Sequence, residues 1–118
     1  MDGYDFRSIE DRWRSFWEQA GLYRTGTRPG AEPFYCLDFF PYPSGSGLSV
    51  GHCRNYIPTD VISRKKRMSG FNVLHPMGWD AFGQPAEEYA IKTGVHPSVV
   101  TAANTDTYRR QMKLIECS

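Results

Sequence analysis

The feature that most constrains this chain is a short apolar run that stops at a cluster of prolines and glycines. The run, residues 34–40 (FYCLDFF), is aromatic and strand-favouring, and a proline stands on each side of it. From Gly51 onward the pattern is helical. The sequence therefore predicts a buried strand, a turn and a helix start over residues 34–52. Four residues exclude regular structure within the turn, namely Pro41, Pro43, Gly45 and Gly47.

This order of elements favours a phosphate site. A strand that enters a helix through a glycine-rich turn leaves backbone amides and the positive end of the helix dipole facing outward. His52 falls in the first helical turn, where its ring can donate to a phosphate oxygen. The glycine spacing misses the dinucleotide fingerprint by one residue, and no Walker lysine follows it. We therefore predict a nucleotide site that is neither an NAD site nor a P-loop.

The composition limits the alternatives. A chain of 118 residues forms one domain at most. Its 14 Lys and Arg residues nearly balance its 13 Asp and Glu residues, so any polyanion binding must be local. The three cysteines (36, 53 and 117) are spaced too widely for a metal knuckle and fit a reducing compartment. With no hydrophobic span or signal peptide, we expect a cytoplasmic protein without membrane association.

Residues 1–33 are expected to form an N-terminal helix and a connector. Apolar residues recur at helical spacing from Ile9 to Ala20, which predicts a helix docked by its aromatic face. Ser8 is the expected N-cap and Gly21 the expected stop. On the solvent side, pairs of Arg14 with Glu10 and with Glu18 are expected. Residues 22–33 are turn-rich and predict the connector.

A helix is predicted over residues 52–68, ending at Ser69-Gly70 and kinked or restarted at Pro58. Its basic run, residues 64–67, indicates a solvated face or a tRNA or phosphate contact. A second strand over residues 71–74 then predicts a right-handed parallel unit with the first. Further helices are expected over residues 86–93 and 101–115. The apolar candidates of the 52–68 helix are Tyr56, Val61, Ile62 and Met68.

The segment after the second strand, residues 75–85, lies where open parallel sheets bind their ligands. Asp80 is its main candidate, because a carboxylate beside Trp79 and Phe82 can hold an ammonium group. The same residue can equally be a turn former or a helix cap. His75 and His96 each precede a proline, and we expect both to be structural.

Two stretches, FPYPSGSGLSVGHCRNY and NVLHPMGWDAFGQPAE, resemble the N-terminal part of leucyl-tRNA synthetases, which are class I aminoacyl-tRNA synthetases. The resemblance runs from the helix of Trp13 to residues 110–113. It implies an α/β fold, the first half of a Rossmann-like (HUP-type) parallel-sheet nucleotide-binding domain. On this basis residues 34–118 are the first, incomplete part of the catalytic domain. It also implies leucine activation with ATP and Mg²⁺, followed by leucyl transfer to tRNA(Leu).

The resemblance also assigns site residues. The first class I signature, His-x-Gly-His, aligns with residues 49–52, so His52 is its second histidine and Ser49 replaces the first. Both are candidate catalytic residues, and the serine weakens or reroutes one contact to the ATP phosphates. No protein-bound metal is expected in this part. The implied ATP-binding residues are Pro41, Tyr42, Pro43, Gly45, Gly47, Gly51, His52 and Asn55. The implied amino-acid-binding residues are Phe39, Phe40, Tyr42 and Asp80.

The last residues, 113–118, depart from the family pattern, which suggests a truncated or frameshifted product or one piece of a split enzyme. A complementary C-terminal fragment is then a possible partner, beside leucine, ATP and tRNA(Leu). Residues 66–70 (KRMSG) mimic the family's second signature but fall at the end of a helix. Two alternatives to a ligase fragment stay open: a non-catalytic ATP-binding fragment, and a non-functional remnant that folds only with its complement.

Overall fold

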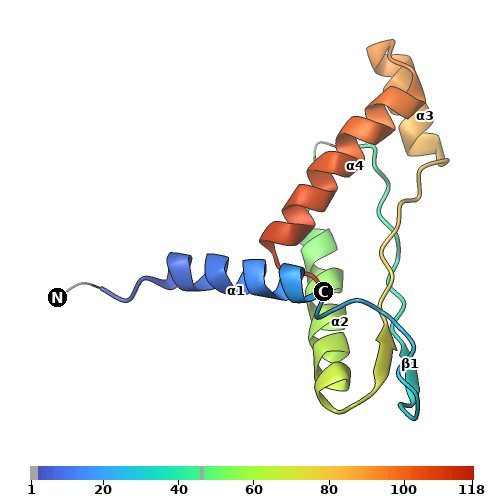
Figure 1. Cartoon of the computed structure of the whole chain (residues 1–118). Helices are drawn as coiled ribbons and strands as arrows, with labels where there is room; N and C mark the ends of the chain where they lie inside the picture. The colour runs from blue at the N-terminus through green and yellow to red at the C-terminus, as the bar shows by residue number, and fades with distance from the viewer. Residues whose placement is uncertain (1–2, 46) are drawn as a thin grey trace.

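The computed structural model of the chain describes residues 3–45 and 47–118. Two short strands lie beside a long helix, a second helix projects to one side, and a helical pair stands at the far end (Figure 1). No helix within these residues is long and apolar enough to cross a membrane. In chain order the elements are α1 (Phe6–Ala20), β1 (Pro33–Tyr35), α2 (Val50–Met68), β2 (Asn72–Leu74), α3 (Gln84–Thr93) and α4 (Pro97–Leu114).

The two strands form a parallel pair, as predicted, with Phe34 opposite Val73. The predicted strand over residues 34–40 is wrong in length, because β1 covers only Pro33–Tyr35. The ladder ends with the bond from the Cys36 amide to the Leu74 carbonyl, at 2.9 Å. Beyond it, the β2 side continues into His75-Pro76, and a proline has no amide to donate. Parallel pairing and helical crossover confirm the α/β fold class.

Helix α2 runs unbroken from Val50 to Met68, so the alternative that it restarts at Pro58 is wrong. A proline inside a helix removes one backbone bond, and the remaining turns are held by packing along one face. That face carries Tyr56, Asp60 and Ser63, which are all buried. The prediction that Val61, Ile62 and Met68 face the core is wrong. These side chains are exposed because the buried face is half polar, a pattern that hydrophobicity cannot reveal.

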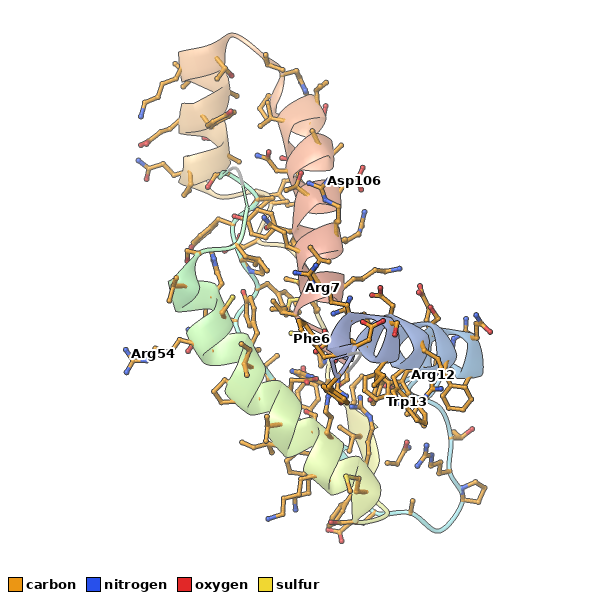
Figure 2. All side chains as sticks on the ribbon, turned by 90° about the vertical axis from the view of Figure 1, so that its left-hand side faces the viewer. Phe6, Arg7, Arg12, Trp13, Arg54 and Asp106 are labelled. Carbon is orange, nitrogen blue, oxygen red and sulfur yellow. The ribbon has the colours of Figure 1, made fainter. Side chains whose placement is uncertain are left out.

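Helix α1 begins at Phe6, not after Ser8 as predicted. Its N-cap is Asp5, whose carboxylate accepts the Ser8 amide at 3.2 Å. Gly21 ends the helix in the left-handed conformation, as predicted. Figure 2 shows cations lying against the exposed aromatic rings of α1, with the Arg12 guanidinium 5.5 Å from the Trp13 ring.

The aromatic face of α1 is not docked as predicted, since no α1 residue is buried. Tertiary contacts are made from its second half: Arg14 Nε donates to the Glu116 carboxylate at 2.7 Å, and Trp17 lies 6.0 Å from the Tyr23 ring and 5.3 Å from the Arg64 guanidinium. The pair of Arg14 with Glu10 is present at 3.7 Å. The predicted pair of Arg14 with Glu18 is wrong. Glu18 instead accepts Lys113 of α4 at 2.6 Å, because α4 ends beside α1.

The two helices at the far end, α3 and α4, each begin earlier in the chain than predicted. Helix α3 begins at Gln84 and ends at Thr93, with the predicted stop Gly94 as its left-handed C-cap. Helix α4 begins at Pro97, four residues before the predicted start, because His96 caps it by accepting the Ser98 amide at 3.3 Å. The small core of the chain lies between α2, the two extended segments and the helical pair. Its buried members include Tyr56, Val73, Ala86, Ala90 and Tyr108.

Candidate functional site

The first turn of α2 is built by two residues that bind each other. The Ser49 hydroxyl accepts the His52 amide at 3.3 Å, and His52 Nδ1 accepts the Ser49 amide at 3.0 Å, which closes a capping box. Because Nδ1 accepts that amide, the neutral imidazole carries its proton on Nε2. The amides of Val50 and Gly51 have no partner among the described residues. The site therefore offers two backbone donors and the Nε2–H of His52 at the positive end of a helix.

Three aromatic rings hold the imidazole of His52. Tyr56, one helical turn later, stacks on it at 5.9 Å between ring centroids, and Phe39 lies at 6.1 Å. Tyr108 of α4 meets it edge-on at 6.0 Å. Tyr56 is fully buried, and burial, together with the nearby Asp38 carboxylate, raises the pKa of its phenol far above the ordinary range. The three uncharged aromatic rings therefore restrict the rotation of the His52 imidazole.

Asp38 is a site residue that sequence reasoning missed. Its carboxylate is buried, accepts the Thr59 hydroxyl at 2.6 Å, and accepts the Phe39 amide at 3.0 Å. These bonds tie the backbone at residues 38–39, where the chain passes His52, to Thr59 in the middle of α2. A single charge inside the apolar run 34–40 was the available signal, because a carboxylate is buried only when it is paired or hydrogen-bonded.

Helix α4 secures the turn between β1 and α2. The Asn104 amide donates to the Pro43 carbonyl at 2.8 Å, and Gln111 Oε1 accepts the Leu48 amide at 2.7 Å. Gly47 has a φ of +154°, and a Cβ there would lie 2.6 Å from the Gln111 amide group. The positive φ favours glycine here, and a side chain would also displace the Gln111 amide from the turn. Sequence reasoning did not connect α4 to the turn, because the bonding residues lie about sixty positions apart and follow no motif.

The segment with Asp80 runs beside the turn. The Asp80 amide donates to the Pro41 carbonyl at 3.0 Å, and Gly78 lies against Phe40, whose ring would be 2.9 Å from a Cβ at residue 78. The Asp80 side chain is exposed. Trp79 meets Tyr108 edge-on at 5.8 Å. Tyr108 therefore contacts both His52 and the residue before Asp80.

The structure thus brings most of the predicted site residues to one end of the strand pair. Phe39 lies against His52, the Tyr42 carbonyl accepts the Tyr108 hydroxyl at 3.4 Å, and Pro41 and Pro43 are fully buried. Asn55 does not point to the turn amides; its side chain donates to the Gly51 carbonyl at 3.0 Å. Two cavities, of about 410 and 330 Å³, lie instead beside α1, and neither is lined by His52 or Asp80.

A family model described as "tRNA synthetases class I (M)" matches residues 38–118. The leucine–tRNA ligase of Leptospira biflexa is 55% identical over 115 residues, which are 98% of this chain and 13% of that protein. The leucine–tRNA ligase of Chlorobium limicola is 53% identical over 110 residues, 93% of this chain and 14% of that protein. This chain therefore spans about an eighth of the length of the curated relatives it matches.

Two solved structures have a similar fold. The LeuRS of Agrobacterium radiobacter K84 (agnB2), in a ternary complex described as LeuRS-tRNA-LeuAMS, superposes with a TM-score of 0.89. It is 39% identical and covers 98% of this chain, which is 15% of that structure. The methionyl-tRNA synthetase of Mycobacterium tuberculosis, in complex with methionyl-adenylate, superposes with a TM-score of 0.65 at 28% identity. That match covers 74% of this chain and 17% of the other.

Proposed function

Because this chain belongs to the class I tRNA synthetase family, we propose that it forms the first part of the catalytic domain of a leucine–tRNA ligase. The observation that carries the proposal is the open start of α2. There, the amides of Val50 and Gly51 have no partner among the described residues, and His52 Nδ1 accepts the Ser49 amide, which leaves Nε2–H to donate. Tyr108 contacts both His52 and Trp79, the residue before Asp80. The full enzyme acts in the cytoplasm on leucine, ATP and tRNA(Leu).

The reaction needs positioning and charge stabilisation more than covalent catalysis. The leucine carboxylate attacks the α-phosphorus of ATP, a P–O bond forms to give leucyl-adenylate, and pyrophosphate leaves with the electron pair of the broken bond. Negative charge builds on the phosphate oxygens during this step. The amides of Val50 and Gly51 and the His52 Nε2–H donate to those oxygens, at the positive end of the α2 dipole.

The residues that bind leucine lie on the segment of Asp80 and on the neighbouring residues 39–42. Asp80 binds the ammonium group of leucine, and an exposed carboxylate at the end of a constrained segment suits that role. Phe39, Phe40 and Tyr42 line the amino-acid and adenylate side, since the three aromatic rings project from the segment that pairs with the Asp80 amide. The buried Pro41 and Pro43 and the turn glycines Gly45 and Gly47 shape the backbone path that ATP follows.

Mg²⁺ accompanies ATP as its counter-ion. The described residues contain no group of three His, Cys, Asp or Glu side chains that would hold a metal ion, so no protein ligands are assigned to it. Asn55 acts indirectly, because its bond to the Gly51 carbonyl steadies the first helical turn. Ser49 serves as the cap of α2, because its hydroxyl accepts the His52 amide, and it does not supply the phosphate contact expected of a histidine at that position.

Calorimetric titration with a non-hydrolysable leucyl-adenylate analogue tests this proposal. We expect binding, and we expect Asp80→Asn to weaken it by about 10- to 100-fold, since a charge-assisted hydrogen bond contributes about 1.5–3 kcal/mol. The matched control is Asp106→Asn, which removes another exposed acid, one that lies on α4 and pairs with Arg109 (Figure 2). Equal affinity in the two variants would contradict the assignment of Asp80.

Leucine-dependent exchange of pyrophosphate into ATP is the matching activity assay. We expect none from the chain alone, because it lacks most of the length of its relatives and one phosphate-binding side chain. A complementary fragment that carries the remainder of the catalytic domain should restore the exchange. Binding of ATP without any exchange in the restored complex would favour a non-catalytic ATP-binding role, for which the Ser49 replacement is the supporting observation.

A further inference from the structure

Side chains on one face of α4 bond to the backbone of the turn between β1 and α2. They come from successive turns of the helix, at Asn104, Tyr108 and Gln111. Asn104 and Tyr108 donate to carbonyls that precede the turn glycines, at 2.8 and 3.4 Å. Gln111 Oε1 accepts the Leu48 amide, which follows those glycines, at 2.7 Å. The helix therefore holds the turn on both sides of Gly45 and Gly47.

Helix α4 is also held at both ends by contacts outside the turn. Near its start it contacts α3, whose Ala86 and Ala90 are buried. Just beyond its end, Glu116 pairs with Arg14 of α1 at 2.7 Å. Figure 1 shows α4 reaching from α3 to the neighbourhood of α1. Loss of a single bond to the turn should therefore free the turn while α4 stays in place.

The turn needs such a hold because glycine leaves its backbone free. Glycine loses more conformational freedom on folding than any other residue, so a turn that contains Gly45 and Gly47 is costly to order. The amide group of Gln111 occupies the space beside Gly47, 2.6 Å from where a Cβ would lie. The same amide group bonds to Leu48. Gln111 thus restrains the peptide group between Gly47 and Leu48 by packing and by a hydrogen bond.

This bond also decides which backbone donors remain for a ligand. The Leu48 amide binds Gln111, and the next amide, that of Ser49, binds His52 Nδ1 at 3.0 Å. The two amides after them, those of Val50 and Gly51, have no partner among the described residues. With the earlier amides bound to side chains, the later two stay presented at the start of α2, where a phosphate binds favourably.

We propose that Gln111 is a positioning residue of the phosphate site and acts through the turn. By binding the Leu48 amide, it keeps the turn in the conformation that presents the amides of Val50 and Gly51. The ligand is the phosphate of ATP or of leucyl-adenylate, a choice that rests on the proposed function. Without the bond to Gln111 the turn samples other conformations, and the apparent affinity falls with the fraction of the chain that remains competent to bind.

Two substitutions of Gln111 separate its hydrogen bond from its bulk. Gln111→Glu keeps an oxygen acceptor at the same length, whereas Gln111→Met keeps the length and removes that oxygen. Amide hydrogen exchange followed by NMR reports the bond in the ligand-free chain. We expect the Leu48 amide to exchange about tenfold faster in Gln111→Met, and within about twofold of the parent rate in Gln111→Glu.

Calorimetric titration with the non-hydrolysable leucyl-adenylate analogue measures the consequence for binding. We expect Gln111→Met to bind about tenfold more weakly than the parent, and Gln111→Glu to bind within about threefold of it. The titrations are run at about 0.5 M salt, which screens the charge that glutamate adds. Gln19→Met is the matched control, since it makes the same change at an exposed position of α1, and it should bind as the parent does.

A third variant, Gln111→Asn, covers the case in which the methionine variant does not fold. Its amide is one methylene closer to the backbone and is too short to reach Leu48. We expect the same loss of Leu48 protection and of analogue affinity as in Gln111→Met. Circular dichroism of each variant checks that α2 and α4 stay folded, so that a change in affinity is measured on folded chains.

Three results would overturn the proposal. These are an unchanged Leu48 exchange rate in the folded Met or Asn variant, parent-like analogue affinity in that variant, and an equal loss in Gln111→Glu, which would assign the effect to packing. If the parent chain does not bind the analogue while Gln111→Met still loses Leu48 protection, the proposed function alone is contradicted. If the parent binds and Gln111→Met binds equally well, the role of Gln111 alone is contradicted.

Discussion

Ser49 and His52 bind each other: the Ser49 hydroxyl lies 3.0 Å from His52 Nδ1 at the first turn of α2. Ser49, which we predict to stand at the first position of the family signature, is a helix cap, and His52 completes that cap. This relationship couples the stability of α2 to the shape of the candidate phosphate site. It also fixes which imidazole nitrogen is left to donate.

We first predict that Ser49→Ala destabilises the chain, because the hydroxyl that accepts the His52 amide is lost. Loss of an N-cap costs about 1 kcal/mol, which corresponds to a fall of about 4 °C in Tm for a chain of this size. Thermal melts followed by circular dichroism measure the change. Ser49→Thr retains the hydroxyl and is the control, with a Tm close to that of the parent chain. An unchanged Tm in Ser49→Ala would show that the capping box does not contribute.

A histidine at residue 49 should recover the missing phosphate contact. Histidine can cap a helix in this chain, since His96 accepts the Ser98 amide at the start of α4. We therefore expect Ser49→His to fold and to bind ATP about tenfold more tightly than the parent, as one added charge-assisted bond would provide. Calorimetric titration of ATP measures this. Ser49→Asn, a good cap without a ring, should give no gain.

The bond from Thr59 to Asp38 should be essential for the site backbone. Thr59→Val removes the donor at 2.6 Å and leaves a buried carboxylate oxygen without its partner, which costs about 1–3 kcal/mol. Urea unfolding measures the loss in the free energy of unfolding. Thr59→Ser keeps the hydroxyl and should lose less than half as much. If Thr59→Ser and Thr59→Val were equally unstable, the methyl group rather than the hydroxyl would be responsible.

Tyr108 should hold the two halves of the site together through its ring. Tyr108→Ala leaves a cavity between His52 and Trp79 and should destabilise the chain by about 3–5 kcal/mol, as other buried aromatic-to-alanine changes do. Tyr108→Phe loses only the long 3.4 Å bond to the Tyr42 carbonyl and should be nearly neutral. Denaturant melts give the stabilities. Titration of Tyr108→Phe with the leucyl-adenylate analogue checks that the hydroxyl is not a ligand contact.

Acid sensitivity should come in part from His75. Burial lowers the pKa of His75 from its ordinary value of 6.5, and both ring nitrogens are buried without hydrogen-bond partners among the described residues. The unfolded chain therefore binds a proton at His75 before the folded chain does. Stability is fully present above pH 6.5 and is lost as the pH falls from that value toward the folded pKa.

The check for His75 is a series of thermal melts between pH 8 and pH 5. We expect the Tm of the parent chain to fall below about pH 6.5, and the His75→Gln chain to show a smaller fall over the same interval. His96→Gln is the matched control, since that histidine is exposed at the α4 cap, and it should keep the acid response of the parent. A parallel response in the His75→Gln chain would assign the acid sensitivity to carboxylates instead.

The local features of the chain were determined by its sequence. Proline and glycine dictate backbone geometry at their own positions, so the turn after residue 40 and the ends of α1 and α3 could be predicted from single residues. The motifs around Ser49, His52 and Asp80 were enough to identify the class I synthetase family, which the comparisons then confirmed.

The tertiary structure decided everything that depends on which segments meet. The burial of Asp38 against Thr59, the hold of Gln111 on the turn and the placement of Tyr108 between His52 and Trp79 join positions 21 to 63 residues apart. The exposure of α1 belongs to the same class. Local propensity acts within a few residues. These features depend instead on which distant segment covers the apolar surface of each element and bonds to its backbone.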